Sequence, residues 1–325
     1  MLMKAIVITK YGGPEVLQYK DVEKPSPAAD QVLVEVKAAS LNASDFEAMR
    51  GSWASRLGGP LRTKHKILGT DIAGTVEMVG SNVTKFQPGE EVLGDLLIPN
   101  GYGAFAEYAC APEKVLALKP ASMTFEQAST YPESGIIALQ SLRGKREIQP
   151  GQKVLINGAG GGMGSFGIQI AKYYGAEVTG VDSAIKIEMM KSIGADHVLD
   201  YKEIDFTKTG ERYDTILDTV ARRSLLSYRR ALNPNGMYIM VGGSRSALFQ
   251  ALVLGPLISR MGSRSYGINP LDQDLMEDYD FLAELFEAGK VVPVIDRSYP
   301  LSEIVEAFHY FEEGHARGKV VITMN

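Results

Sequence analysis

The chain has 325 residues, of which 45% are hydrophobic and 22% are charged, a composition typical of a globular protein long enough for two domains. Its net charge of −5 argues against a nucleic-acid-binding surface, which requires a basic patch. The single cysteine, Cys110, excludes a disulfide within the chain and a multi-cysteine zinc site, and we expect a reducing, cytoplasmic location.

Residues 1–124 are predicted to form an irregular, mostly antiparallel β domain. Short strand patterns, separated by glycine and proline, occur at Lys4–Thr9, Gln31–Ala38, Gly74–Val79, Glu91–Leu93, Ala104–Ala109 and Lys114–Ala117. The first pattern begins near the N-terminus, which shows no apolar core of the length found in signal peptides. Ser122 with Glu126, ahead of an apolar periodic run, predicts a helix that leads into a second domain.

A glycine-rich stretch, Lys153–Gly164, dominates the second half of the chain. Its first part, Lys153–Asn157, predicts a buried parallel strand, and Ser165–Tyr174 predicts a helix. Glycines permit a tight turn and a close approach of the backbone to a phosphate, which the helix N-terminus then attracts. The spacing Gly158-x-x-Gly161-x-x-Gly164 is one residue looser than the common G-x-G-x-x-G, so a plain strand-to-helix turn remains the alternative.

The context of the glycines favours a dinucleotide-binding domain. A second strand, Glu177–Val181, ends at Asp182, which lies 182 − 164 = 18 residues past the last glycine. That distance is close to the roughly 20 residues expected for a ribose-binding acid. Further strand patterns follow at His197–Tyr201, Tyr213–Val220 and Gly236–Gly243.

The apolar segment 247–261 fits neither a strand nor a helix pattern well. It is too short to span a bilayer, so no membrane partner is expected, and it is open to interpretation as core, as a subunit contact or as a mobile lid. The remaining predicted elements are a helix, Asp272–Ala288, a strand, Val292–Asp296, a helix, Leu301–Glu312, and a final strand, Lys319–Thr323.

Several motifs together resemble the medium-chain dehydrogenase/reductases, most closely the zinc-free branch of the quinone oxidoreductases and related enone reductases. The matching stretches are Leu41-Asn42-Ala43-Ser44-Asp45, Arg50-Gly51, Leu68-Gly69-Thr70-Asp71-Ile72-Ala73-Gly74, Phe86-Gln87-Pro88-Gly89-Glu90-Glu91-Val92, the glycine loop, Gly194-Ala195-Asp196-His197 and Gly318-Lys319-Val320-Val321. The resemblance implies an α/β protein with a GroES-like, β-rich catalytic domain, residues 1–124 and 271–325. A Rossmann domain with a doubly wound parallel sheet, residues 125–270, would be inserted in it, with the substrate in the cleft between domains.

The resemblance also implies catalytic residues and the absence of a metal. In zinc-dependent members, the positions of Asn42, Thr70 and Glu133 carry the zinc ligands. An amide, a hydroxyl and a carboxylate make a poor zinc site, so no metal is expected. Asn42 could donate a hydrogen bond to an acceptor oxygen, Ser44 matches a proton-relay hydroxyl, and Glu133 departs from the apolar residue usual in the branch. The alternatives are a turn amide for Asn42, a helix cap for Ser44 and a solvent-facing Glu133.

The cofactor implied is a nicotinamide dinucleotide. The residues expected to bind it are Gly158, Gly161, Gly162, Met163, Gly164, Asp182, Ser183, Lys186, Tyr201, Val241 and Gly242. Asp182 would accept hydrogen bonds from ribose hydroxyls and repel a 2′-phosphate. By contrast, Ser183, Lys186 and Tyr201 match positions that hold that phosphate in NADPH-using relatives. Because Lys186 could offset Asp182, the balance favours NADP(H) over NAD(H) by a narrow margin.

The expected function is reduction of a quinone or an α,β-unsaturated carbonyl by NAD(P)H. One alternative is a zinc-independent alcohol or aldehyde dehydrogenase, and a second is a nucleotide-binding protein without turnover. The expected partners are a small-molecule substrate and a second copy of the chain. We expect the homodimer to pair its Rossmann domains across the strand near Gly236–Gly243 or the apolar segment after it.

Overall fold

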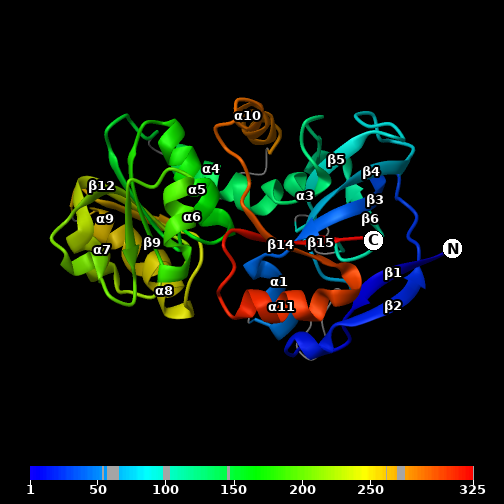
Figure 1. Ribbon diagram of the computed structural model, residues 1–325, viewed down its shortest axis with the longest axis horizontal. Helices are drawn as coiled ribbons and strands as arrows, with labels where there is room; N and C mark the ends of the chain where they lie inside the picture. Colours follow the sequence, from blue (N-terminus) through cyan, green and yellow to red (C-terminus); the bar gives the residue numbers. More distant parts are fainter. Residues whose placement is uncertain are drawn as a thin grey trace. The chain divides into compact units, whose positions relative to one another are not determined.

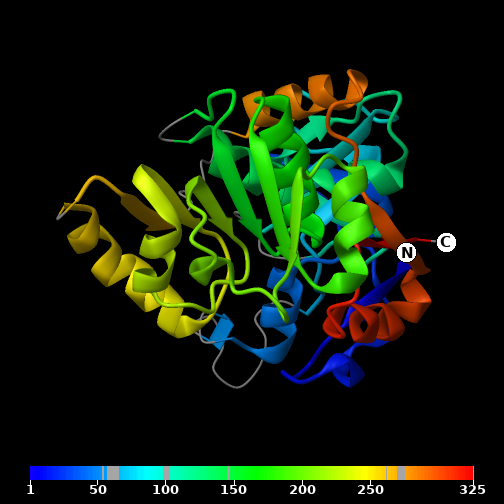
Figure 2. The same cartoon turned by 60° about the vertical axis from the view of Figure 1, so that its left-hand side comes forward.

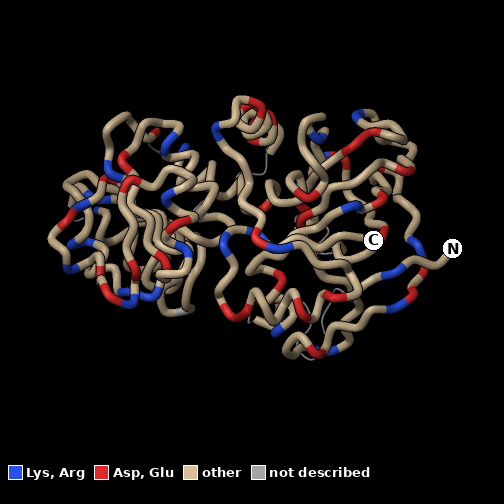
Figure 3. Tube along the Cα trace, in the orientation of Figure 1, with Lys and Arg blue, Asp and Glu red and all other residues tan. Residues whose placement is uncertain are grey.

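The chain folds into two compact units, each built around its own sheet (Figure 1). The structure is a computed structural model that describes residues 1–52, 55–56, 66–97, 103–144, 147–260, 262–268 and 275–324. The first unit comprises Met1–Glu133 and Ile295–Asn325, and the second comprises Ser134–Val294. Acidic and basic residues are interspersed along the trace of both units (Figure 3).

Both boundaries between the units differ from the predicted ones at residues 124/125 and 270/271. The later boundary moves because helix α10 (Met276–Glu287) packs on α4 (Ile136–Arg143) inside the second unit. The buried carboxylate of Asp278 accepts a hydrogen bond from Gln140 Nε2 at 2.7 Å and forms an ion pair with Arg143. Periodicity correctly indicated a helix here, but it carries no information about the unit against which that helix packs. The part of its predicted range from residue 272 to 274 lies outside the described residues.

The first unit contains a seven-stranded sheet and a separate antiparallel hairpin. Its strand order is β14-β15-β3-β4-β5-β7, with β6 paired to β3, and the only parallel pairing of the described strands in this sheet is β14 with β15. The bounds are β3 (Gln31–Ser40), β4 (Asp71–Val79), β5 (Glu91–Asp95), β6 (Tyr108–Pro112), β7 (Leu116–Leu118), β14 (Ile295–Pro300) and β15 (Lys319–Thr323). The hairpin is β1 (Leu2–Val7) with β2 (Gln18–Glu23). The sequence analysis missed β2, because nearly all of its residues are polar or exposed.

Strands β3, β4 and β5 extend beyond their predicted bounds, and each extension ends in a polar residue. Ser40 ends β3 and Asp71 begins β4, and these two residues are paired in the antiparallel register. Asp71 is also paired with Asp95, the last residue of β5. The register therefore brings buried polar side chains together at one end of an otherwise apolar sheet.

The α-helices described in the first unit are α1 (Ala43–Arg50), α3 (Phe125–Ala128) and α11 (Ile304–Glu312), and a π-helical turn, Tyr131–Gly135, begins at its end. The rings of Phe46 on α1 and Phe308 on α11 pack with their centroids 4.5 Å apart within the main apolar core. Helix α3 begins at Thr124, which forms a capping box with Gln127. The predicted start at Ser122 and Glu126 was therefore wrong by two residues, because Thr124 offers the same hydroxyl closer to the apolar run.

The second unit is a doubly wound sheet of six parallel strands in the order β10-β9-β8-β11-β12-β13. Figure 2 brings this unit toward the viewer. The bounds are β8 (Lys153–Asn157), β9 (Glu177–Asp182), β10 (His197–Asp200), β11 (Tyr213–Asp218), β12 (Leu232–Met240) and β13 (Ser265–Ile268). From β8 the chain adds β9 and β10 on one side of the sheet, and from β11 it adds β12 and β13 on the other side. Because crossovers are right-handed, α5 (Gly162–Tyr173) and α6 (Ile187–Ser192) cover one face, and α7 (Leu225–Ala231) and α9 (Gly255–Arg260) cover the other. Between β8 and β11 the direction of winding changes, and in doubly wound sheets ligands bind at such a point, beyond the carboxyl ends of the two strands.

The apolar segment is helical, which its sequence pattern did not show. It forms α8 (Arg245–Phe249), a π-helical turn (Gln250–Leu254) and α9, and residue 261 lies outside the described part. Five of its apolar side chains are exposed: Phe249, Leu252, Val253, Leu254 and Leu257. In the described part of the chain, no helix is both long enough and apolar enough to cross a membrane.

Candidate active site and cofactor loop

A buried polar cluster lies at the end of the first unit's sheet. Its backbone framework is the register that aligns Ser40, Asp71 and Asp95, together with the start of α1 and the first residue of β15. Asn42 is the N-cap of α1, and the Asp45 carboxylate accepts its backbone N–H at 2.9 Å. That bond belongs to a capping box at the helix start, and the Asn42 side chain also reaches into the cluster.

The Asn42 side chain hydrogen-bonds both to the buried carboxylate of Asp71 and to the buried ammonium of Lys319. Its Nδ2 donates to Asp71 Oδ2 at 2.8 Å and to Thr70 Oγ1 at 3.2 Å, while its Oδ1 accepts from Lys319 Nζ at 2.5 Å. Lys319 Nζ is also 3.5 Å from Asp71 Oδ2, and Ser40 Oγ donates to the same oxygen at 2.9 Å. These contacts compensate two charges that would be costly to bury alone.

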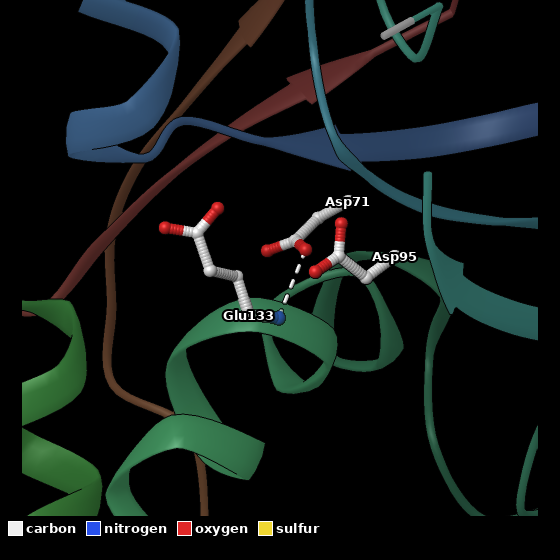
Figure 4. A group of neighbouring side chains, drawn as sticks. All are labelled: Asp71, Asp95 and Glu133. Atoms are coloured by element: carbon white, nitrogen blue, oxygen red, sulfur yellow. Dashed lines mark hydrogen bonds between the residues drawn. The ribbon is translucent and has the colours of Figure 1, made fainter. Parts of the chain in front are cut away.

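Glu133 lies on the π-helical turn and joins the cluster from that side. Its Oε2 accepts hydrogen bonds from Ser44 Oγ at 2.7 Å and from Thr70 Oγ1 at 3.2 Å. Its backbone N–H donates to Asp71 Oδ1 at 2.9 Å, which is the dashed line in Figure 4. Burial and the neighbouring Asp71 charge raise the pKa of Glu133 to about 7, against the opposing effects of Ser44, Lys319 and Thr70. A carboxyl group that titrates near neutrality is suited to acid–base chemistry.

Three further carboxyl groups face the same space. Figure 4 shows the side chains of Asp71, Asp95 and Glu133 directed toward one another from β4, β5 and the π-helical turn. Burial raises the pKa of Asp71, and it raises those of Asp95 and Asp45 well above their usual range, with neighbouring carboxylates adding to the effect at Asp95 and Asp45. With one lysine facing four acids, these groups cannot all be ionised at neutral pH.

The donor set of this cluster does not fit zinc. The positions expected for zinc ligands carry Asn42, Thr70 and Glu133, and the amide oxygen of Asn42 already accepts from the Lys319 ammonium. Oxygens of Asp71, Asp95 and Glu133 lie within 4.8 Å of one another, but both Asp71 oxygens accept N–H or O–H donors. Zinc prefers thiolate and imidazole ligands, and an adjacent ammonium repels a cation.

The predicted catalytic residues Asn42, Ser44 and Glu133 lie together, but the role predicted for Asn42 does not agree with the geometry. Both of its amide hydrogens are donated inside the cluster, so it is an orienting residue rather than a donor to an acceptor oxygen. Ser44 is inside α1 and is not its cap, since Asn42 occupies that position. The sequence analysis did not identify Asp95 or Lys319 as site residues, because only strand register and a contact across 277 residues bring them here.

The glycine loop has the geometry expected of a phosphate-binding turn. Gly158 follows β8 with φ +85°, a backbone conformation that favours glycine, and a Cβ at Gly164 would lie 2.2 Å from the Gly158 carbonyl oxygen. Helix α5 begins at Gly162, so the predicted helix start at Ser165 was three residues late. At Gly161 a Cβ would meet only the Gly158 oxygen within 4 Å, at 3.5 Å, which leaves the helix N-terminus open to a ligand.

Asp182 accepts hydrogen bonds from the glycine loop and from Ser183, the residue that follows it. Its Oδ2 accepts from the Gly160 backbone N–H at 2.9 Å and its Oδ1 from the Ser183 N–H at 2.8 Å, and Lys186 Nζ lies 3.5 Å away. The Lys186 side chain is buried and crosses the glycine loop at Gly160, where any Cβ would collide with it at 2.5 Å. The hydroxyl of Ser183 is buried and has no hydrogen-bond partner among the described residues. Each Asp182 oxygen accepts one N–H and keeps acceptor capacity for a second donor, so its role toward the ribose hydroxyls stays a prediction.

Of the other predicted cofactor residues, Met163 lies in the first turn of α5, and Tyr201, Val241 and Gly242 lie just beyond the carboxyl ends of strands. Tyr201 follows β10 and is half exposed, and its N–H donates to the Asp182 carbonyl. Val241 and Gly242 follow β12, and a Cβ at Gly242 would lie 2.6 Å from the Thr219 carbonyl oxygen. Thr219, which the sequence analysis did not identify, packs against Gly158 from the end of β11. The sequence feature that could have identified Thr219 is its position at the end of a predicted strand next to the glycine loop.

Two family models match the chain. Residues 28–121 match the alcohol dehydrogenase GroES-like domain, and residues 193–322 match a domain described as zinc-binding dehydrogenase. The first match lies within the unit that holds the polar cluster. The second covers much of the parallel sheet and continues into the final strand of the first unit.

Proteins of known activity resemble the chain over nearly its whole length. It is 33% identical to the 2-methylene-furan-3-one reductase of Solanum lycopersicum and 32% identical to the chloroplastic NADPH-dependent alkenal/one oxidoreductase of Arabidopsis thaliana, with 98% of this chain and 79% of each relative covered. The solved quinone oxidoreductase of Coxiella burnetii superposes with a TM-score of 0.89 at 31% identity, covering all of both chains. The chain therefore belongs to the medium-chain dehydrogenase/reductase family of oxidoreductases, in its quinone oxidoreductase-like branch.

Proposed function

We propose that this protein is an NAD(P)H-dependent reductase of activated acceptors, either quinones or α,β-unsaturated carbonyl compounds. The observation that carries the proposal is a carboxyl group, Glu133, that titrates near pH 7 and contacts the Ser44 hydroxyl at 2.7 Å in a cluster unsuited to zinc. An enone or quinone needs only a hydride and a proton, whereas a simple alcohol gains from a Lewis acid on its oxygen. Relatives with 31–33% identity that are named for such reductions support the same conclusion.

Two groups of residues have separate roles in this reaction, one in cofactor binding and the other in proton delivery. The glycine loop and the α5 N-terminus hold the pyrophosphate of the nicotinamide cofactor, whose bound form supplies a hydride. Negative charge then develops on the acceptor oxygen, and a preorganised donor there lowers the barrier by about 2.7–4 kcal/mol. Ser44 and Glu133 are that donor and its proton source, while Asn42, Thr70 and Lys319 hold them in place.

The test is a comparison of acceptors with one cofactor. We expect NADPH oxidation with 1,4-quinones or short enones, and at least tenfold slower oxidation of ethanol or 2-propanol with NADP+, followed by nicotinamide absorbance. Faster turnover of the alcohols would favour a dehydrogenase instead. No turnover with any activated acceptor would favour a nucleotide-binding protein without catalysis.

For the cofactor we propose NADP(H) over NAD(H). The carboxylate of Asp182 is held by backbone N–H groups, Lys186 Nζ lies 3.5 Å from it, and the hydroxyl of the next residue, Ser183, has no hydrogen-bond partner in the described part of the chain. Lys186→Met should raise the KM for NADPH about 10- to 100-fold, because a charge-assisted phosphate contact of about 1–3 kcal/mol is lost. The KM for NADH should stay within about threefold, as should both values in the control Lys191→Met, which removes an exposed lysine of α6. Equal losses for the two cofactors in Lys186→Met would reverse the choice.

We also propose that activity does not depend on zinc. The buried ammonium of Lys319 carries the positive charge beside Asp71, and the side chains at the expected ligand positions already hydrogen-bond one another. Elemental analysis should find well below one zinc per chain, and incubation with a chelator should leave the reductase rate unchanged. About one zinc per chain, with activity lost in chelator and restored by zinc, would contradict this.

We propose a homodimer formed through the second unit. Strand β12 lies between β11 and β13, so among the described strands β13 is the edge at this end of the sheet, beside the exposed apolar helices, and it favours pairing there or through those helices. Light scattering at micromolar concentration should give twice the chain mass of 35.3 kDa. Leu252→Glu should shift the mass toward the monomer. Leu118→Glu, an equally exposed position (59%) in the other unit, should not. A wild-type monomer would exclude the dimer.

A further inference from the structure

Lys319 is a buried ammonium that contacts Asn42 and Asp71. It is the first residue of β15, and its side chain is only 2% exposed. Its Nζ donates to Asn42 Oδ1 at 2.5 Å and lies 3.5 Å from Asp71 Oδ2. Because burying an amine is costly, a lysine at this position needs a compensating role or partner.

The neighbours of the Asn42 amide leave it one orientation. An ammonium can only donate, so the Asn42 atom that faces Lys319 must be the oxygen. With the oxygen facing Lys319, the other end of the amide, which faces Asp71, must be the NH2 group. The same NH2 group therefore also donates to Thr70.

The orientation of the Asn42 amide also fixes the direction of the hydrogen bond between Thr70 and Glu133. Thr70 Oγ1 accepts from Asn42 Nδ2, so its single hydrogen is directed to Glu133 Oε2, 3.2 Å away. Ser44 Oγ, the other hydroxyl on Oε2, has no other hydrogen-bond partner among the described residues. Ser44 can therefore reverse from donor to acceptor, whereas Thr70 cannot without turning the Asn42 amide.

We propose that Lys319 is a positioning residue for proton delivery: it fixes the direction of the Asn42–Thr70–Glu133 chain, so that Ser44 is the hydroxyl of this pair that takes a proton from Glu133 and passes it on. The inference rests on the proposed reductase activity. The balance is simple: Glu133 gives one proton to Ser44, the Ser44 hydroxyl gives its own to the reduced acceptor, and water reprotonates Glu133.

Lys319 also sets the electrostatic environment. The ionisable groups that face Glu133 are Asp71 from β4, Asp95 from β5, Asp45 from α1 and Lys319 from β15, so Lys319 is the one cation in this described group. Its positive charge favours the ionised form of Glu133, and its removal should raise the pKa of Glu133.

The test pairs Lys319→Met, which keeps the length of the side chain without charge, with Lys319→Arg, which keeps the charge. In Lys319→Met the pH at which kcat falls should rise by about one unit, while Lys319→Arg should keep the wild-type midpoint. Ser44→Ala should lower kcat about 100-fold in the wild-type background. In the Lys319→Met background, Ser44→Ala should lower kcat less than tenfold. Without Lys319 the Asn42 amide can turn, so the Thr70 hydroxyl can change from donor to acceptor and take the proton instead.

A second pair remains informative if Lys319→Met does not fold. Thr70→Val should lower kcat less than tenfold, and Ser44→Ala should cost as much in that background as in the wild type. Equal losses for Thr70→Val and Ser44→Ala would overturn the proposal, as would an unchanged pH midpoint in a folded Lys319→Met.

Infrared titration of the free protein separates this inference from the proposed function. The carboxyl band that Glu133→Gln removes should titrate at higher pH in Lys319→Met than in wild type, without substrate or turnover. An enzyme inactive on every acceptor, with this shift present, would contradict the reductase but not the role of Lys319. An active enzyme without the shift would contradict the role of Lys319 alone.

Discussion

Glu133→Gln should lower kcat for enone or quinone reduction by about 10²- to 10⁴-fold at pH 6, because the amide cannot supply a proton. The KM for the acceptor should change little, since the amide oxygen can accept from Ser44 and Thr70 as Glu133 Oε2 does. Steady-state kinetics would measure both values. Glu126→Gln, a carboxylate of the nearby helix α3, is the control and should keep wild-type rates.

The pH dependence follows from the same group. Glu133 must hold a proton to act as an acid, and its pKa is about 7. The wild-type kcat should therefore be level below pH 7 and fall about tenfold per pH unit above it, and the Glu133→Gln residual rate should lack this midpoint. Wild-type activity with an unchanged pH profile in Glu133→Gln would exclude Glu133 as the acid.

The raised pKa also affects stability, with a defined sign. The folded protein binds the Glu133 proton more tightly than the unfolded chain, where the pKa is near its ordinary value of 4.5. The stability contributed by the protonated group is thus complete below pH 4.5 and is lost as the pH rises through about 7. The stability of Glu133→Gln relative to wild type should therefore rise from pH 5 to pH 8. Melting temperatures of both proteins at the two pH values would show this.

Gly164→Ala should destabilise the second unit and abolish cofactor binding. Its Cβ would lie 2.2 Å from the Gly158 oxygen and 2.6 Å from Ala159 Cα, and backbone atoms cannot move aside cheaply. Overpacking of this kind costs about 1–3 kcal/mol, which corresponds to a fall in melting temperature of about 3–10 °C.

Gly161→Ala is the matched control for that substitution. Gly161 has an ordinary φ of −88°, and its Cβ would meet one atom, at 3.5 Å. The melting temperature of the free protein should stay within about 1 °C of wild type, while the Kd for NADPH should rise because the methyl group faces the open helix N-terminus. A wild-type melting temperature and wild-type NADPH affinity in Gly164→Ala would contradict the close-packed turn.

The cofactor loop was predictable because its signals are local. Strand β8, the glycines and the start of β9 lie within a short stretch, and both β8 and β15 have the bounds that their apolar runs predicted. The Asp182 role was not predictable in the same way. Its spacing from Gly164 matches a ribose-binding acid, but spacing cannot show that the carboxylate also accepts the Gly160 N–H and lies 3.5 Å from Lys186 Nζ.

The catalytic cluster was predictable only in part, because its contacts are distant in the sequence. Asn42, Ser44 and Glu133 were identified through resemblance, whereas the contact of Lys319 with Asn42 spans 277 residues. The neighbourhood of Asp71 and Asp95 depends on the register of β4 with β5, which periodicity does not define. The amide of Asn42 was assigned the wrong role for the same reason, since its partners become visible only after the sheet is assembled.

The central claim, hydride transfer to an activated acceptor, is tested most directly with NADPH deuterated at C4. In ordinary water, reduction of an enone should place one deuterium on the carbon β to the carbonyl and a solvent-derived hydrogen on the α-carbon, as mass spectrometry and NMR of the product would show. Glu133→Gln should slow the reaction without changing the labelled position. Products that carry no deuterium, or transfer of label only between NADP+ and deuterated simple alcohols, would contradict the account.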